Sequence, residues 1–539
     1  MVKKSRCSIF AGVLRKAVKV LLCKSLRVVS SFIMEKYYYI KLATARDLSG
    51  ADRALFRALE IFPGFLAWST ILGMVAASYF IPVWAAIFII AFDVYWLVKT
   101  VFLSFHLRAN FERMRQNLKI DWYERLSRLH SEHIWQLVIL PMSKEPYEVV
   151  RDSVEALKRS MWPKNRMIII LATEERYADK GIGSRVKDEY RTIFPNLLIT
   201  VHPSNIYGEM PGKGSNESWA AKKAKEEFVD RHGIPYENII VSSFDIDTRI
   251  YPQYFEILTW HFLTTENPLK SSYQPVPIYN NNIWLAPALS RVVATSGTFW
   301  QMMQQERPER LTTFSSHSMS FKTLVDLDFW QKNIVSEDSR IFWNSLLFYD
   351  GDYKSIPLSY PVSLDANLAP NFWGTAKNVY KQQRRWAWGA ENFPYVVFGL
   401  IKNKNITFYK KAYYVFNMIE GFWSWSTNAI LIFALGWLPL LLGGREFNQL
   451  VLAYNLPQIT RIIMTLAMAG LFTSAIISLK LLPPRPKEYK KSKNLSMVLQ
   501  WLLVPITVIF FGAIPALDAQ TRLMLGKYMG FWITPKERR

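Results

Sequence analysis

Residues 239–247 read Ile-Ile-Val-Ser-Ser-Phe-Asp-Ile-Asp, and this stretch decides the fold. Its β-branched opening predicts a buried strand. Asp245 and Asp247 close the stretch, two positions apart. At the carboxyl end of a strand in an open α/β sheet, such a pair points into the crevice where ligands bind. The carboxylates therefore favour a Mg²⁺ or Mn²⁺ site beside a phosphate, although most isolated D-x-D triplets are turns or exposed loops.

Strand-like and helix-like segments alternate around this stretch. Short apolar runs predict further strands at residues 137–140, 167–171 and 197–201. Apolar residues between the first two runs repeat at helical spacing, and another helix is expected near residues 216–230. This alternation predicts an α/β domain with a doubly wound, mostly parallel sheet over residues 130–375.

The composition indicates membrane spans joined to a polar domain. Of the 539 residues, 50% are hydrophobic while 20% are charged. The net charge of +23 suits an anionic membrane face or nucleic acid. We expect the membrane and no nucleic acid, because the cations flank apolar runs. Cys7 and Cys23 are the only cysteines, too few for a disulfide framework or a cysteine zinc site.

Apolar runs predict α-helical transmembrane segments on both sides of the α/β domain. Residues 1–60 form a basic region whose first half predicts an amphipathic helix on the inner membrane face, with a cleavable signal peptide as the alternative. Residues 61–105 predict a transmembrane hairpin, in which Asp93 could line a polar path or pair with a neighbouring helix. Transmembrane helices are expected within residues 412–482. A basic loop and a third C-terminal membrane segment follow at residues 483–517.

Residues 213–216 read Lys-Gly-Ser-Asn, a glycine-bearing loop that opens a helix. Backbone N–H groups at a helix start and the cation of Lys213 would suit a diphosphate, with Asn216 beside it. An ordinary loop with a helix start is the plain alternative.

Residues 336–338 read Ser-Glu-Asp and precede an apolar run. Glu337 and Asp338 could simply charge the first turn of a helix. In the functional interpretation, one of the two carboxylates is a general base.

Gln382, Arg385 and Trp386 lie at positions i, i+3 and i+4 of an interfacial helix expected within residues 376–411. Residues with this spacing share a helix face, so one face offers an amide, a cation and a large aromatic ring. This set could hold a phosphate and stack on a sugar. A basic helix with Trp386 anchored at the lipid headgroups is the alternative.

The order K…D-x-D…S-E-D…Q-x-x-R-W, flanked by apolar segments, resembles the processive family-2 glycosyltransferases, which include the cellulose, chitin and hyaluronan synthases. The resemblance covers about residues 130–400. It implies a GT-A-like catalytic domain and a hexosyltransferase that inverts the anomeric carbon. It also implies a nucleotide-diphosphate sugar as donor, with a UDP-sugar expected, and Mg²⁺ or Mn²⁺ as cofactor.

The resemblance assigns each motif residue a role in one active site. Lys213 and Arg385 would contact the diphosphate, and Asp245 and Asp247 would bind the donor and the metal. Asp338 would be the general base, with support from Glu337. Gln382 would orient the site, and Trp386 would border the acceptor sugar.

Two positions depart from the family pattern. Ser336 replaces the usual Thr and keeps its hydroxyl. The acid that usually follows the second strand and contacts the nucleotide base has no clear match. Glu174 is the expected substitute, and Glu145 after the first strand is a further candidate for the nucleotide pocket. The identity of the base therefore stays open.

The tail at residues 518–539 contains Phe-Trp-Ile-Thr-Pro-Lys at residues 531–536, which resembles the F-x-V-T-x-K gating loop of cellulose synthases. That loop closes over the nucleotide from the cytoplasmic side, so Lys536 would reach the diphosphate as a mobile lid. The role requires residues 495–517 to bend back or lie along the membrane interface, which two prolines within the segment would permit. A full span with a coincidental tail motif is the alternative.

These features predict a multi-pass protein of the plasma or inner membrane with a cytoplasmic catalytic domain. We expect it to add sugars to a growing polysaccharide, with coupled translocation as a further option, and to contact membrane lipids. One alternative is a non-processive transferase that glycosylates a lipid carrier. Another, from a different class, is a catalytically dead membrane scaffold or channel.

Overall fold

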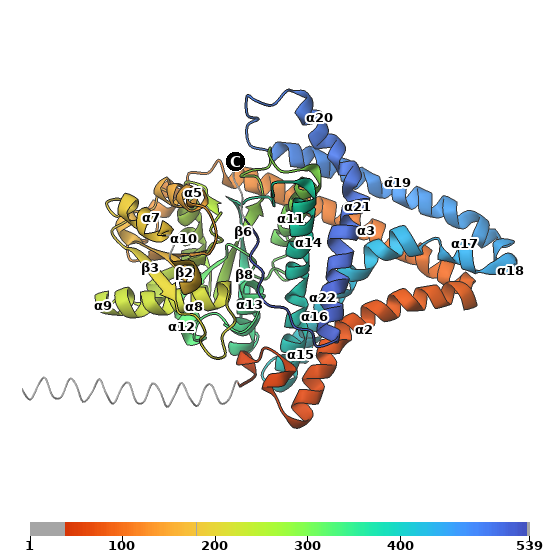
Figure 1. Cartoon of the computed structure of the whole chain (residues 1–539), viewed down its shortest axis with the longest axis horizontal. Helices are drawn as coiled ribbons and strands as arrows, with labels where there is room; N and C mark the ends of the chain where they lie inside the picture. The colour runs from red at the N-terminus through yellow and green to blue at the C-terminus, as the bar shows by residue number, and fades with distance from the viewer. Residues whose placement is uncertain (1–37, 179–180, 536–539) are drawn as a thin grey trace, which may run out of the picture.

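A computed structural model of the chain describes residues 38–178 and 181–535. The expected amphipathic N-terminal helix and Lys536 lie outside the described residues. At the centre is an eight-stranded sheet with the order β3-β2-β1-β4-β7-β6-β8-β5 (Figure 1). The strands are β1 (Trp135–Met142), β2 (Met167–Glu174), β3 (Leu197–His202), β4 (Ile239–Ser243), β5 (Arg249–Ile250), β6 (Ser271–Ile278), β7 (Ser318–Ser320) and β8 (Lys354–Ser363).

The sheet is parallel where the sequence predicts strands and mixed beyond them. β3, β2, β1 and β4 pair in parallel, so the stretch that opens the sequence analysis supplies a central strand. Beyond β4, strand β7 runs antiparallel to both β4 and β6, and β5 runs antiparallel to β8. β6 and β8 are parallel. Parallel pairings thus outnumber antiparallel ones, which confirms an α/β domain with a mostly parallel sheet.

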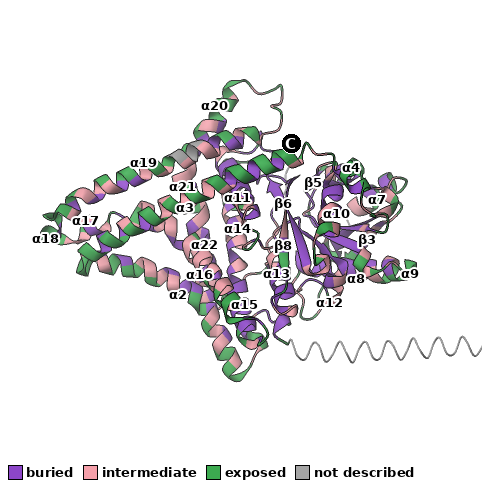
Figure 2. Ribbon diagram, turned by 180° about the vertical axis from the view of Figure 1, so that it is seen from behind, coloured by how far each residue is buried: buried purple, intermediate pink, exposed green. Residues whose placement is uncertain are grey.

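Helices cover both faces of the parallel half, as the doubly wound prediction requires. Val138 and Leu140 of β1 pack on one face against α5 (Tyr147–Lys158), α7 (Ile182–Tyr190) and α10 (Tyr254–Thr264). Leu137 and Ile139 point to the other face, against α8 (Lys213–Ala224), α12 (Phe321–Asp326) and α13 (Glu337–Phe348). Successive side chains of a strand point to opposite faces, and the strands are accordingly buried on both sides (Figure 2).

Two long helices, α11 (Ala288–Gln305) and α14 (Phe372–Ala387), stand between the sheet and the apolar helices (Figure 1). The smaller helices of the polar part are α4 (Trp122–Ser127), α6 (Glu175–Ala178), α9 (Asp230–His232) and α15 (Asn392–Lys402). The Q-x-x-R-W motif lies on α14, which confirms the predicted helical spacing of its residues.

Four helical segments among the described residues are long and apolar enough to cross a membrane. They are α2 (Gly50–Phe80), α3 (Pro82–Asn117), α19 (Val451–Lys480) and the continuous run Ser492–Met524, which comprises α20 (Ser492–Leu499), α21 (Val504–Val508) and α22 (Ile514–Met524). α2 and α3 form the predicted hairpin, with Pro82 at the first position of α3. Pro lacks the N–H that a helix start leaves unpaired, so the hairpin turns there.

Residues 421–443, an apolar run at the start of the region 412–482 where transmembrane helices are expected, are not among the four. The segment is divided between the end of α16 (Phe408–Ile430), a π-helical turn at Leu431–Leu435 and the short α17 (Leu438–Leu442), which α18 (Gly444–Asn448) follows. Pro439 near the start of α17 has no N–H to continue the earlier helix, which explains the break.

The run Ser492–Met524 differs in direction from the other apolar helices. In Figure 1, α2, α3, α17 and α19 extend together away from the sheet, whereas α22 runs across them beside α14. Its end is fastened to the start of α2: Trp68 Nε1 donates to Thr521 Oγ1 at 2.9 Å, and Arg57 donates to the carbonyl of Leu523 at 3.0 Å. The chain therefore leaves α22 next to the α/β domain.

A glycine pair on α2 tests this packing. A Cβ atom at Gly64 would lie 2.7 Å from the carbonyl oxygen of Gln520 on α22, whereas Gly73 on the same helix faces open space. We expect Gly64→Ala to lower the thermal midpoint of the protein in detergent, because overpacking costs about 1–3 kcal/mol. Gly73→Ala should hold or raise the midpoint, since Ala favours a helix. Equal midpoints for the two variants would contradict the close contact of α2 with α22.

Candidate active site

The ammonium of Lys213 brings three predicted motifs together. Lys213 is the first residue of α8, and its Nζ lies 2.8 and 2.9 Å from the two carboxylate oxygens of Asp338 and 2.9 Å from Oδ1 of Asp245. Asp245 follows β4, and Asp338 is in the first turn of α13. Both acids keep part of their side chains exposed, 33% for Asp245 and 20% for Asp338, so this side of Lys213 is accessible.

Two further acids lie on the buried side of Lys213. Glu217 Oε1 is 3.7 Å from Lys213 Nζ, and Glu337 Oε1 is 3.9 Å from it. Ser243 Oγ donates to Glu217 at 2.6 Å. Within the described residues neither carboxylate oxygen of Glu337 has a hydrogen-bond partner. Both glutamates are fully buried, so Lys213 separates an accessible pair of acids from an enclosed pair.

Burial and mutual repulsion shift the titration of this cluster. Burial disfavours the ammonium, but the carboxylates of Asp245 and Asp338, followed by Glu217 and Glu337, outweigh it and raise the pKa of Lys213 well above its usual value. Burial also raises the pKa of Glu217 to about 8. Burial, together with the charge of Asp338, raises the pKa of Glu337 well above its usual value. The lysine therefore stays charged, and Glu217 keeps its proton near neutral pH.

The glycine of the Lys-Gly-Ser-Asn motif allows this approach of helices. A Cβ atom at Gly214 would lie 2.9 Å from the carbonyl oxygen of Gln331 and 3.1 Å from Cβ of Glu337. A larger residue would push α13 away from α8, and Asp338 away from Lys213. The glycine thus serves helix packing in addition to any phosphate contact.

The D-x-D pair is split between an enclosed and an accessible carboxylate. Asp247 is fully buried, and its Oδ2 accepts the backbone N–H of Asp365 at 2.9 Å. Asp245 accepts from Ser315 Oγ at 2.6 Å. Among the described residues, no group of three His, Cys, Asp or Glu side chains converges on a metal position. Two carboxylates still fit Mg²⁺ or Mn²⁺, which commonly take their other ligands from phosphates and water.

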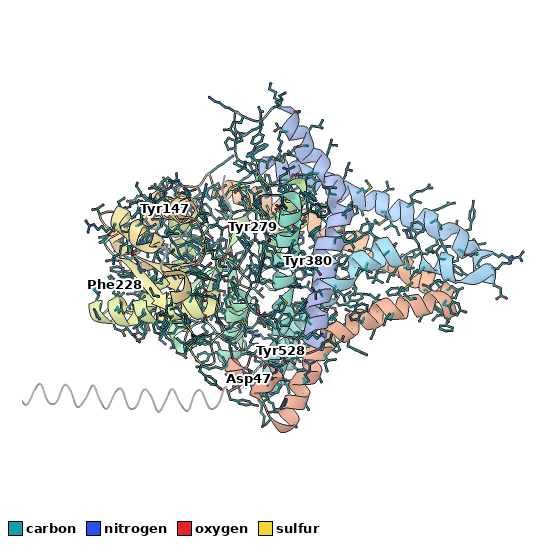
Figure 3. All side chains as sticks on the ribbon, in the orientation of Figure 1. Asp47, Tyr147, Phe228, Tyr279, Tyr380 and Tyr528 are labelled. Carbon is teal, nitrogen blue, oxygen red and sulfur yellow. The ribbon has the colours of Figure 1, made fainter. Side chains whose placement is uncertain are left out.

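Arg385 and Trp386 of α14 border the same site. The indole of Trp386 lies against the rings of Tyr279 and Phe314, with centroids 6.0 and 5.8 Å away. Tyr279 is buried between the sheet and α14 (Figure 3), and burial raises its pKa, with further contributions from Asp245 and Asp247. Trp386 therefore stands one aromatic ring away from the acidic cluster.

The tail also reaches the site. The Arg385 guanidinium lies 5.2 Å from the centroid of the Phe531 ring, and the same ring fills the space where a side chain at Gly212 would be. Tyr528 donates to both carboxylate oxygens of Glu60 on α2 at 3.0 and 2.9 Å. The tail thus passes from α2 to the loop before Lys213.

Three predicted site residues make other contacts. Asn216 donates to the carbonyl of Ala172 at 2.8 Å, which fastens α8 to β2. Glu174 pairs with Arg176 at 2.7 Å. Gln382 is half-buried on α14, one turn before Trp386. Their roles toward a donor stay predictions.

The sequence analysis missed several residues of the site. Glu217 could have been found, because its position four residues after Lys213 places it on the same helix face. Tyr279, His317 and Glu391 carry no local pattern. His317 is fully buried with Nδ1 3.7 Å from Asp338, and burial lowers its pKa to about 4, so it is a neutral neighbour of the acids.

No protein-family model and no curated protein matches the chain. Among solved structures, the mannosyltransferase PcManGT from Pyrobaculum calidifontis in complex with GDP-Man and Mn²⁺ is similar with a TM-score of 0.37 and 14% identity, covering 72% of this chain and 99% of that one. S. aureus TarS 1–349 in complex with UDP-GlcNAc gives a TM-score of 0.35 and 10% identity, covering 73% of this chain and 93% of that one. GalNAc-T7 with UDP, GalNAc and Mn²⁺ gives a TM-score of 0.32 and 11% identity, covering 53% of this chain and 57% of that one. Similarities this low carry no functional argument by themselves.

The enclosed proton of Glu217 predicts a pH-dependent stability. With a pKa of about 8 in the folded chain, Glu217 keeps a proton that it releases on unfolding. Its stabilisation is complete below about pH 4.5 and is lost as the pH rises toward about 8. We expect the thermal midpoint of Glu217→Gln, relative to the wild type, to rise between about pH 5 and pH 9, because glutamine has no proton to lose.

The matched control for this titration is Glu226→Gln, at an exposed glutamate after the same helix. Its midpoint should stay parallel to that of the wild type across the range. A Glu217→Gln difference that is as flat as that of the control would contradict the enclosed proton.

Proposed function

We propose that the chain is an inverting membrane glycosyltransferase that moves a sugar from a nucleotide-diphosphate donor to a growing polysaccharide. One observation carries the proposal: Lys213 Nζ lies within 2.9 Å of both Asp245 and Asp338, which come from separate motifs. A cation, donor-side acids and a candidate base next to an aromatic border form the set that such a transfer needs.

Lys213 and Arg385 would stabilise the leaving diphosphate. Lys213 and Arg385 supply two fixed positive charges on the accessible side of the cluster, where charge develops as the diphosphate departs. Lys213 pairs with both Asp245 and Asp338, so a diphosphate that reaches its ammonium competes with these acids for its protons. A divalent metal held by Asp245 and Asp247 would add charge neutralisation on the same oxygens.

Asp338 provides for the acceptor. Its carboxylate is partly exposed and close to Lys213, so it can accept the proton of an attacking hydroxyl once its contacts with the ammonium loosen. One base and one displacement invert the anomeric carbon, and an α-linked donor gives a β-glycoside. Glu337 lies on the enclosed side of Lys213, 3.9 Å from its ammonium and next to Asp338 in the chain, where it would support the base.

Trp386 provides the acceptor border. Its ring is half-buried, and Gly297 of α11 leaves room beside it, with a hypothetical Cβ at that glycine 3.8 Å from the indole. An aromatic ring that keeps part of its surface exposed is suited to stack on a sugar. Gln382 lies one turn away on the same face.

The path of α22 supports a cytoplasmic tail. Arg57 and Glu60, at the domain end of α2, hold Leu523 and Tyr528 respectively. A segment that returns to the start of α2 favours a run along the membrane interface over a further full crossing. We therefore propose a multi-pass protein of the plasma or inner membrane with its catalytic domain and tail on the cytoplasmic side, and with Lys536 available as part of a lid.

A panel of nucleotide sugars tests the function. The purified protein in detergent or nanodiscs is incubated with UDP- and GDP-sugars and Mn²⁺ or Mg²⁺, and the released nucleoside diphosphate and the product are measured. A polymer supports the proposal, whereas a single addition to a lipid supports the non-processive alternative. No release with any donor would favour a scaffold or channel and contradict a transferase.

The general base gives the first mechanistic prediction. Asp338→Asn should bind the donor nearly as well as the wild type and lose transfer by about 10² to 10⁴-fold, because the amide keeps its shape but cannot accept a proton. Titration calorimetry and product formation measure the two effects. Asp326→Asn, at a surface ion pair with Lys322, is the control. Near-normal turnover of Asp338→Asn would remove this residue from the mechanism.

The aromatic border at Trp386 gives the second mechanistic prediction. Trp386→Ala should impair extension of an acceptor more than hydrolysis of the donor, since water needs no stacking surface. Trp373→Ala, on the same helix but 79% exposed, is the control and should change neither rate. Equal losses of both activities in Trp386→Ala would indicate a structural role for the indole.

A further inference from the structure

Glu391 connects the helix that carries Trp386 to the helix that carries Asp338. It ends the short helical turn Trp388–Glu391 that follows α14, and it is buried. Its Oε1 accepts the backbone N–H of Val335 at 3.1 Å, the N–H of Ser336 at 2.8 Å and Ser336 Oγ at 2.6 Å. Its Oε2 accepts from Trp388 Nε1 at 2.8 Å. One enclosed carboxylate thus holds four donors.

This carboxylate caps α13 from outside the helix. Ser336 is the N-cap residue of α13, but its side chain makes no cap hydrogen bond to the helix, because the hydroxyl is given to Glu391. A helix start leaves backbone N–H groups unpaired and carries partial positive charge. The negative charge of Glu391 therefore lies where a helix start favours it, two residues before Asp338.

Asn392 adds a second attachment on the same turn. Its Nδ2 donates to Ser339 Oγ at 2.9 Å, and its Oδ1 accepts from Arg340 Nε at 2.6 Å. Arg340 is fully buried, donates to the carbonyl of Leu42 at 3.1 Å and lies 3.9 Å from the ring centroid of Tyr395. The first turn of α13 is therefore held on both sides of Asp338.

We propose that Glu391 is a positioning residue, which fixes the candidate base Asp338 at a set distance from the acceptor border at Trp386. The inference rests on the proposed function, since it concerns the transfer step of that site. Lys213 and Asp245 come from α8 and the end of β4, which make no hydrogen bond to Glu391, so these two donor-side groups are held independently of it. Loss of Glu391 should accordingly misplace the base against the acceptor while donor binding persists.

Glu391→Gln is the informative variant. In one orientation, the glutamine oxygen still accepts the N–H groups of Val335 and Ser336, but the glutamine NH₂ then faces the N–H of Trp388. In the reverse orientation, the NH₂ group faces the three donors of Val335 and Ser336. The change keeps the volume and breaks at least one hydrogen bond. Ser336→Ala removes the hydroxyl partner from the other side, and the double variant completes a cycle.

The experiment measures kcat for transfer, KM for the donor and the thermal midpoint for the wild type and these variants. We expect Glu391→Gln to lower kcat by about 10- to 100-fold, as misplacement of reacting groups does, with the donor KM within about twofold of the wild type. Effects of the two single changes should be non-additive. Glu306→Gln, which removes charge from a glutamate bound by Asn110 and Arg113 of α3 and by no residue of α13, is the control for lost stability.

The possible results distinguish a failure of the positioning role of Glu391 from a failure of the proposed transferase function. A wild type that transfers sugar and a Glu391→Gln variant with unchanged kcat would overturn the positioning role. So would a kcat that falls only in proportion to the folded fraction, as in the Glu306→Gln control. A wild type without transfer or hydrolysis for any donor would overturn the proposed function instead. Faster amide exchange at the start of α13 in Glu391→Gln, with α8 unchanged, would add support in either case.

Discussion

The ammonium of Lys213 lies within 4 Å of four carboxylates, and the rest of the site depends on this contact. Without a cation, the charged carboxylates of Asp245 and Asp338 would repel one another, and an enclosed charge is costly unless it is paired. The buried ammonium and the acids therefore stabilise one another, and this pairing requires α8, the end of β4 and α13 to pack together. α8 supplies the cation and Glu217, the end of β4 supplies Asp245, and α13 supplies Glu337 and Asp338.

The residues around this cluster hold these elements in contact. Gly214 has no side chain, so α13 can approach α8, and Glu391 fastens the start of α13 to the helix that carries Trp386. The same helix, α14, separates the sheet from the apolar helices (Figure 1). α22 and the tail then close the arrangement, because Tyr528 is held by Glu60 on α2 while Phe531 reaches Arg385. The site is thus connected to the apolar helices through both α14 and the tail.

Local pattern predicts the elements well and their contacts poorly. The β-branched run at residues 239–241 predicts β4 because such side chains suit a buried strand, and the short link at Pro82 between two apolar runs predicts the hairpin. Strands β5, β6, β7 and β8 are not predicted. β5 and β7 have only two or three residues and carry no period, whereas β6 and β8 each contain two prolines, which argue against a strand. Residues 421–443 are apolar enough to suggest a span but are broken near Pro439. The pairing of Lys213 with Asp338 joins positions 125 residues apart, so it depends on how α8 and α13 pack, which the local pattern does not encode.

The most direct measurement is a structure of the protein with a nucleoside diphosphate, UDP or GDP, and Mn²⁺, determined in nanodiscs. The account predicts the diphosphate on the accessible side of Lys213, with Lys213 Nζ in hydrogen-bond distance of a phosphate oxygen. It also predicts the metal on Asp245 and Asp247, with Asp338 facing Trp386. A diphosphate bound elsewhere, with the Lys213–Asp338 pair unchanged, would contradict it.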